Sequence, residues 1–291
     1  MSQKIKQTSQ GTFTSIVAVR AFLSLREFTF FCHYWGPSPQ VTQPQAQPNS
    51  DTDQTIIIIM GRWGWRLFEG DQDLDVVLSI SEDTLGIKTG QWDYRLSAMV
   101  HQSDMLAPPE AATIYRTEEY AYELANIIVP YVRRKLDTGN LGERMFAASR
   151  AKESDPDDLF QHSKYRTIIM GALIMRAGAR INAADLQHLR DLVPQINCTS
   201  RRTLFDDHGF RSPGRAQFLA ALDHYQPGVA RSFQEPSCFK CGKIEEDIGR
   251  KPLQCKKCKV ATYCGRDCQR DQWREHRVSC IPPGQRRMLN V

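Results

Sequence analysis

The C-terminal fifth of the chain carries four closely spaced pairs of cysteine and histidine residues. Two or three residues separate the members of each pair: Cys238 and Cys241, Cys255 and Cys258, Cys264 and Cys268, His276 and Cys280. Thiolate and imidazole are ligands that zinc prefers, and four of them complete one tetrahedral site. Eight ligands therefore predict two zinc ions. Both are expected to be structural, because a site with four protein ligands leaves no position for a catalytic water.

The spacing within the pairs predicts their local structure. A turn with two residues between its cysteines aims both thiolates at one ion, whereas three intervening residues place two side chains on one face of a helix. Cys264 and Cys268, like His276 and Cys280, are therefore expected on short helices. The spacing leaves open whether the pairs share ions in sequence order or in a crossed order.

Free or disulfide-bonded cysteines are the alternative explanation for this cluster. A disulfide scaffold is typical of a short secreted chain with a signal peptide, and this chain of 291 residues has no clear signal of that kind. Only Cys32 and Cys198 lie outside the cluster. Paired cysteines with one histidine substituted favour metal in a reducing compartment. We therefore expect an intracellular protein, in the nucleus or the cytoplasm.

The positive charge of the chain is concentrated beside these cysteines. Residues 236–291 contain 13 bases and 6 acids, whereas residues 60–235 contain 21 bases and 24 acids. Two zinc ions and seven thiolates would change the net charge by about −3, so the basic excess partly compensates for the metal sites. No motif for reading bases accompanies it, and nucleic acid is not an expected partner. No apolar stretch is long enough to predict a membrane-spanning helix.

The segment 60–235 predicts a mainly helical domain of unknown function. Apolar periodicity and capping residues predict several helices. The first two cover Asp71 to Leu85 and Thr117 to Leu136, the second with a kink at Pro130 and a stop at Gly139. Asp155-Pro156 is expected to open a third helix, and an apolar segment predicts a fourth from Tyr165 to Gly178. A fifth is capped by Asn182 and ended by Pro194, and a sixth runs from Ser212-Pro213 to Pro227-Gly228.

The N-terminal part differs in composition from this helical segment. Residues Pro37 to Thr55 are rich in Pro, Gln, Ser and Thr, which predicts a disordered linker. Met60 is a candidate start, so we expect residues 1–59 to be a disordered or optional extension. The predicted organisation is this extension, a helical domain at 60–235, a zinc module at 236–284 and a basic tail at 285–291.

The zinc module resembles the MYND zinc finger. After two Cys-x2-Cys pairs, the chain reads Tyr263-Cys264-x3-Cys268-Gln269-x3-Trp273-x2-His276-x3-Cys280, and every ligand position matches. The resemblance covers residues 238–280; the preceding helical segment is similar to that of uncharacterised fungal MYND proteins. It implies a cross-brace in which one ion is held by Cys238, Cys241, Cys264 and Cys268, and the other by Cys255, Cys258, His276 and Cys280.

The resemblance also implies a binding function. MYND fingers mostly bind proteins, and characterised members hold extended proline-rich peptides against positions that match Gln269 and Trp273. A tryptophan is a rigid apolar platform for proline, and an extended peptide loses little entropy on binding. A purely structural Trp273 in the core of the finger is the alternative. An adaptor that recruits protein partners, with transcriptional regulation as its setting, is therefore the favoured function.

An enzyme is the competing class of function. Its site would lie in the 61–235 segment and the finger would target it to a substrate, but no motif there names a reaction, and no catalytic residue is assigned. Some MYND fingers occur inside SET-domain lysine methyltransferases. This chain lacks the Asn-His-Ser motif of that domain, which disfavours methyltransferase activity because function resides in the site.

Overall fold

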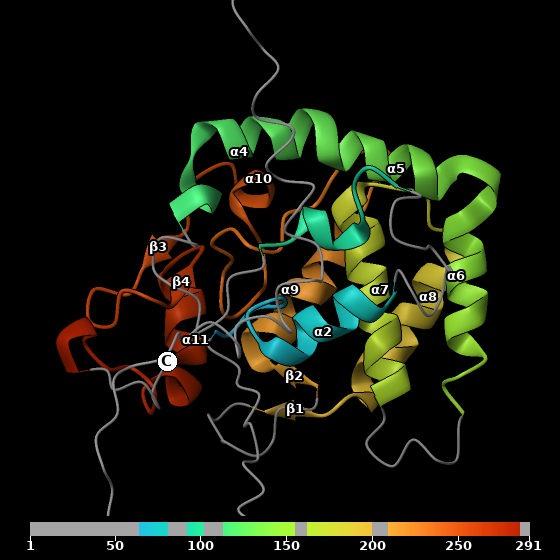
Figure 1. The fold of residues 1–291 in the computed structure, drawn as a ribbon. Coiled ribbons are helices and arrows are strands. Elements are labelled where there is room, and N and C mark those ends of the chain that lie inside the picture. Colours follow the sequence, from blue (N-terminus) through green and yellow to red (C-terminus); the bar gives the residue numbers. More distant parts are fainter. Residues whose placement is uncertain (1–63, 81–91, 102–112, 155–161, 200–208, 286–291) are drawn as a thin grey trace, which may run out of the picture. The chain divides into compact units, whose positions relative to one another are not determined.

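The computed structural model describes residues 64–80, 92–101, 113–154, 162–199 and 209–285 (Figure 1). Three expectations lie wholly or mostly outside these residues: the N-terminal extension 1–59, the cap at Asp155-Pro156 and the basic tail. The described residues belong to one unit, which runs from Ile57 to the C-terminus.

The body of the protein is mainly helical, as the sequence predicted. Its helices are α2 (Asp71–Ser79), α4 (Glu118–Glu123), α5 (Val129–Asp137), α6 (Leu141–Arg150), α7 (His162–Ala177), α8 (Ala183–Leu192) and α9 (Ser212–Asp223). A short parallel pair of strands, β1 (Cys198–Thr199) and β2 (Phe210–Arg211), precedes α9. No described helix is long and apolar enough to cross a membrane.

Several helix starts follow directly from their capping residues. The side chain of Asn182 accepts a hydrogen bond from the Asp185 backbone N–H at 2.8 Å and opens α8. Pro213 occupies the first turn of α9, where its missing N–H costs nothing. Pro130 likewise lies in the first turn of α5, after a π-helical segment at Leu124–Ile128 that joins α4 to α5. The predicted irregularity near Pro130 is thus a change of helix type.

One helix of the body has no counterpart in the sequence-based prediction. Gly139 and Asn140 adopt left-handed conformations with φ of 61° and 53°, and α6 begins immediately after them. Its buried positions, Gly142, Met145, Phe146 and Ser149, have helical spacing, but only two of the four side chains are large and apolar. Packing against α5 and α7 therefore stabilises this helix where the pattern alone could not identify it.

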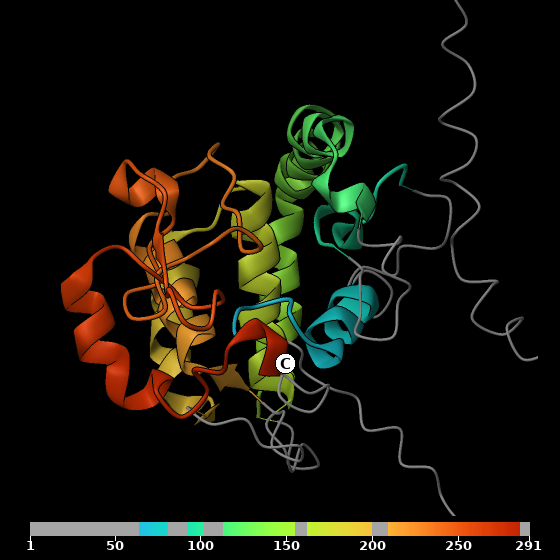
Figure 2. The same cartoon turned by 90° about the vertical axis from the view of Figure 1, so that its left-hand side faces the viewer.

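Helix α7 is the centre of the hydrophobic core. It contacts α2, α5, α6, α8 and α9, and Figures 1 and 2 show it within this group of helices. Ile168, Ile169, Leu173 and Ile174 are fully buried on it. A buried acid ties α2 to the same helix, because Asp73 accepts a hydrogen bond from the Tyr165 hydroxyl at 2.7 Å.

The C-terminal module lies beside α9, away from α5 and α6 (Figures 1 and 2). It contains α10 (Glu245–Ile248), an antiparallel pair of strands, β3 (Leu253–Gln254) and β4 (Thr262–Tyr263), and α11 (Arg266–His276). These elements are too short to form a large core of their own.

Truncation of Leu173 should strongly destabilise the body. Leu173→Ala leaves a cavity in the core at α7, and we expect the free energy of unfolding to fall by about 2–5 kcal/mol. Urea unfolding followed by far-ultraviolet circular dichroism measures this loss. Tyr122→Ala is the control, since Tyr122 is 67% exposed and should change the value by less than about 0.5 kcal/mol. Equal losses would contradict the central position of α7.

Acid should weaken the fold through His101. Its ring stacks on Tyr115 with the centroids 4.6 Å apart, and burial together with the positive charge of Arg176 lowers its pKa from 6.5 to about 4. The unfolded chain binds this proton more readily, so stability should fall as the pH drops from 6.5 to about 4. Thermal melts across this range should show a flatter pH dependence for His101→Gln; an unchanged slope would exclude His101 as the cause.

Candidate metal centre

The C-terminal module brings the eight predicted ligands into two groups of four. Within each group, the candidate donor atoms all lie within 4.8 Å of one another. The groups are Cys238, Cys241, Cys264 and Cys268, and Cys255, Cys258, His276 and Cys280. Each group combines alternate pairs along the chain, so the arrangement is crossed.

Three separations between donor atoms match the edges of zinc tetrahedra, whereas the sulfurs of Cys264 and Cys268, 3.2 Å apart, are closer than such an edge. Zn–S bonds of about 2.3 Å and Zn–N bonds of about 2.0–2.1 Å imply S···S edges of roughly 3.8 Å and S···N edges of roughly 3.6 Å. The sulfurs of Cys241 and Cys264 are 3.7 Å apart, and those of Cys255 and Cys280 are 3.8 Å apart. The Cys258 sulfur lies 3.5 Å from the Nε2 atom of His276.

The chemistry of the donors supports the same ion. All seven cysteines of the module are free, and a disulfide would require sulfurs only about 2.05 Å apart. His276 must be neutral to ligate a metal, and burial, followed by the charge of Lys257, lowers its pKa. The module therefore fits two structural zinc ions, which would join its segments without any open coordination position.

Helix α11 carries a ligand of each group. The sequence predicted separate short helices for the last two pairs, but α11 is continuous from Arg266 to His276. Cys268 lies in its first turn and His276 at its end, about 12 Å apart at 1.5 Å per residue. Cys264 precedes the helix and Cys280 follows it. The expectation of two helices was wrong because no breaker separates Cys268 from His276.

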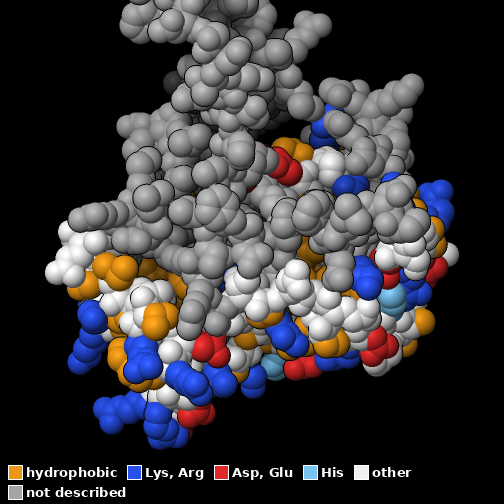
Figure 3. All heavy atoms as spheres, turned by 90° about the horizontal axis from the view of Figure 1, so that it is seen from below, with side chains coloured by type: hydrophobic (Ala, Val, Ile, Leu, Met, Phe, Trp, Pro, Cys, Tyr) orange, Lys and Arg blue, Asp and Glu red, His pale blue; other side chains and the backbone are white. Residues whose placement is uncertain are grey.

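The outer face of α11 presents the predicted peptide-binding pair. Gln269 and Trp273 are one turn apart, and Trp273 is 44% exposed. The Trp273 ring lies 5.8 Å from the ring of His276, between centroids. Lysine and arginine side chains gather on the side of the molecule where this module lies, at the lower left of Figure 3. The exposed bases of the module include Lys256, Lys257, Lys259, Arg270 and Arg274.

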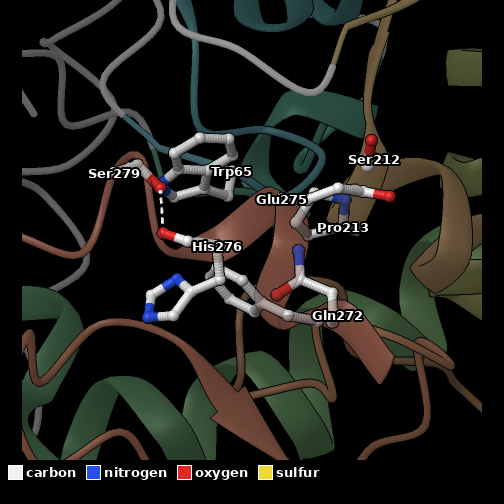
Figure 4. A pocket seen from close by; sticks show the side chains of 8 residues that line it. Trp65, Ser212, Pro213, Gln272, Glu275, His276 and Ser279 are labelled. Carbon is white, nitrogen blue, oxygen red and sulfur yellow. Dashed lines mark hydrogen bonds between the residues drawn. The ribbon is translucent and has the colours of Figure 1, made fainter. Parts of the chain in front are cut away.

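The small core of the module is built around aromatic rings. The Tyr263 hydroxyl donates to the Gln272 side-chain oxygen at 2.8 Å, and the Tyr263 ring packs edge-on against Phe239. The third ring belongs to Trp65, which comes from the other end of the described chain and lies 6.3 Å from Phe239. Figure 4 shows Trp65 near His276 of the finger and Pro213 of α9.

Sequence reasoning missed Trp65 as a residue of the core that supports the metal centre. More than 170 residues separate it from the first ligand, Cys238, and it belongs to no ligand motif. The residues beside it, Trp63 and Gly64, have no spacing relation to the cysteines. No local pattern therefore indicated that Trp65 packs against the finger.

An ion pair and a close backbone contact hold the module on the body. Arg231 forms two hydrogen bonds with the carboxylate of Asp247 in α10, one of them 2.6 Å long. Burial would raise the pKa of Asp247, but the bonds from Arg231 outweigh it and hold the pKa below its usual range. Gly242 has φ of 72°, and a Cβ there would lie 2.0 Å from the Ala216 carbonyl oxygen. Glycine is therefore required where the module touches α9.

Each group of four should lose one zinc when a ligand is removed. Cys268→Ser and Cys258→Ser are each expected to reduce the zinc content from two ions per chain toward one, because a three-ligand site binds more weakly. Native mass spectrometry counts the ions. Cys198→Ser is the matched control, since this cysteine lies outside both groups and is exposed. Retention of two ions by both ligand variants would contradict the assignment.

Comparison with known proteins identifies the module. The family model of the MYND finger matches residues 238–280. The chain is 42% identical over 45 residues to the MYND-type zinc finger protein samB of Emericella nidulans, covering 16% of this chain and 8% of that protein. It is 31% identical over 85 residues to the N-lysine methyltransferase SMYD2 of Bos taurus, covering 25% of this chain and 19% of that protein.

These comparisons match only a part of this chain and a small part of each relative. The chain spans less than a fifth of the length of either relative, and no solved structure matches it. The family match, the relatives and the two Cys/His groups agree on the C-terminal module. Residues 238–280 are a MYND finger, a zinc-binding module of the protein-interaction class.

Proposed function

We propose that this protein is an adaptor whose finger recruits partner proteins, in transcriptional regulation. In this proposal, the eight grouped side chains hold two zinc ions, and a partner presents an extended proline-rich peptide to Gln269 and Trp273. The helical segment 60–235 carries the finger at 236–284, which a basic tail follows. The exposure of Trp273 on a helix that runs between both metal groups is the observation that supports this function.

The position of Trp273 argues against a purely structural role. Buried rings fill the core of the finger at Phe239, Tyr263 and Trp65, while 44% of Trp273 remains exposed. A large exposed aromatic side chain on a rigid element suits the binding of a partner, because little conformational entropy is lost when the ring is covered. Proline rings are a suitable cover, since polyproline segments are extended before they bind.

Gln269 can complement this apolar contact. It lies one turn before Trp273 on α11 and is partly exposed. Among the described residues, no hydrogen bond engages its side chain. An amide offers both donors and an acceptor, and an extended peptide leaves its backbone N–H and C=O groups available. The pair therefore offers one apolar and one polar contact to the same peptide.

The closed metal groups favour binding over catalysis at the finger. Four protein donors surround each proposed ion, which leaves no position for water or substrate. SMYD2 is named as an N-lysine methyltransferase, but the match covers 19% of that protein. An enzyme site in the 61–235 segment is the competing function, and no specific observation favours it.

Removal of the Trp273 ring should abolish most of the peptide affinity while both zinc ions stay bound. For Trp273→Ala, we expect a loss of about 2 kcal/mol or more in binding free energy, as for a central aromatic contact. Fluorescence anisotropy with labelled proline-rich peptides measures the Kd, and native mass spectrometry confirms the zinc content.

Leu78→Ala is the matched control for this experiment. Leu78 lies on α2 and is 44% exposed, the same fraction as Trp273. It should leave the peptide Kd unchanged. If Trp273→Ala binds the peptides as tightly as the control, or captures the same proteins from a lysate as the unaltered chain, the peptide-binding role is wrong.

A further inference from the structure

We infer that the Gly64–Gly70 loop is a functional part of the finger, and that Arg66 is a positioning residue for the first zinc group. This group is Cys238, Cys241, Cys264 and Cys268. The loop belongs to the body by sequence, so the finger depends on the body to retain its metal. The inference concerns the hold on zinc and is independent of what the finger binds.

Arg66 connects the two segments that supply the ligands of this group. Its Nε donates to the Ser237 hydroxyl at 3.1 Å, and its Nη2 donates to the Thr262 hydroxyl at 3.0 Å. Ser237 immediately precedes Cys238, and Thr262 lies two residues before Cys264. One guanidinium group therefore holds the approaches to the first and third ligand pairs together.

The two segments that Arg66 contacts are also hydrogen-bonded to each other. The Thr262 hydroxyl donates to the Ser237 carbonyl oxygen at 2.6 Å, and the Phe239 N–H donates to the Thr262 carbonyl oxygen at 2.8 Å. The Arg66 guanidinium lies over the Phe239 ring, 5.2 Å from its centroid. The planar fork of arginine suits this site, because it reaches two acceptors while it lies over a ring.

Contacts within the loop itself also hold Arg66 in place. The Glu69 carboxylate accepts hydrogen bonds from the backbone N–H groups of Trp65 and Arg66 at 2.8 and 2.9 Å. It also lies 3.4 Å from the Arg66 Nη1 atom. A Cβ at Gly64 would lie 2.0 Å from the same carboxylate, so the loop closes tightly only with glycine there. This preorganisation reduces the entropy that Arg66 loses in its contacts with the finger.

The body anchors the other side of the loop. Leu67 and Phe68 are buried in the main hydrophobic core, and the Phe68 N–H donates to Asp73 at 2.8 Å. The Leu67 N–H donates to the Gln217 side chain at 3.3 Å, and Arg211 donates to the Gly64 carbonyl oxygen at 2.8 Å. The loop is therefore fixed to the helical body by these contacts and to the finger by Arg66.

Charge favours the same role for Arg66. A zinc ion with four thiolates carries a net charge of roughly −2, and the segments that supply these thiolates are the ones that Arg66 contacts. The Arg66 side chain is only 11% exposed. A cation with so little water around it interacts more strongly with nearby negative charge than an exposed one does.

Zinc release from the full-length holoprotein tests this inference. The protein is mixed with the colorimetric chelator 4-(2-pyridylazo)resorcinol, and absorbance records the release of each ion. We expect Arg66→Ala to release one of the two ions about tenfold faster, the lower end of the range for partners that support a metal ligand. Arg66→Lys should restore only part of the retention, because one ammonium group cannot reproduce the fork.

Two further variants separate direct support from general effects. Arg134→Ala removes an exposed arginine of α5 and should release zinc at the unaltered rate. Arg231→Ala breaks the ion pair with Asp247, which holds the finger on the body without contacting Ser237 or Thr262. It should release zinc more slowly than Arg66→Ala does.

A double-mutant cycle provides the decisive comparison, because Ser237→Ala removes a partner of Arg66 with little change in volume. If the two side chains act together, the combined variant should release zinc no faster than Arg66→Ala alone. Unchanged release in Arg66→Ala, fully additive effects, or equal release in Arg231→Ala would each overturn the inference. No peptide is present in the assay, so a failure of the Trp273 site would leave its result unaffected.

Discussion

Crossed ligation of two zinc ions is the constraint on which the finger depends. Cys241 and Cys264 are 23 residues apart in the chain, and Cys255 and Cys280 are 25 apart, yet each pair of sulfurs is less than 4 Å apart. Two-residue strands and a small aromatic core offset little of the entropy of closing such loops. Metal binding supplies the missing free energy, as in other small zinc modules. The position of α11, and with it Trp273, follows from these two sites.

The finger is also part of the packing of the whole unit. Trp65 joins the finger core although it precedes α2, the first helix among the described residues. Arg231 pairs with Asp247, and Gly242 lies against the backbone of α9 at Ala216. A finger held at several points presents Trp273 in one orientation, whereas a finger on a free linker would not. In the proposed adaptor function, such fixed presentation would lower the entropy lost when a partner is captured.

The sequence predicted the elements whose signals are local. Local signals include Asn182 as a cap, Pro213 in a first helical turn and the apolar run of α7. Each of them favours helix in the residues directly beside it. The ligand spacing likewise identified the donors. Helix α6 was missed because Met145 and Phe146 are the only large apolar side chains on its buried face, which packs against α5 and α7. The continuity of α11 was missed because spacing describes pairs of ligands, and it does not describe the chain between them.

The sequence by itself determined the metal chemistry, since thiolates and an imidazole at these spacings suit zinc, and four donors for each ion leave no catalytic position. It also determined the helical class of the body through apolar periodicity and caps. Only the tertiary structure decided that Trp65 and Arg66 belong with the finger, and that Trp273 remains exposed while Tyr263 is buried. The physical reason is distance along the chain: contacts across more than 170 residues depend on how the body folds, and no local pattern encodes them.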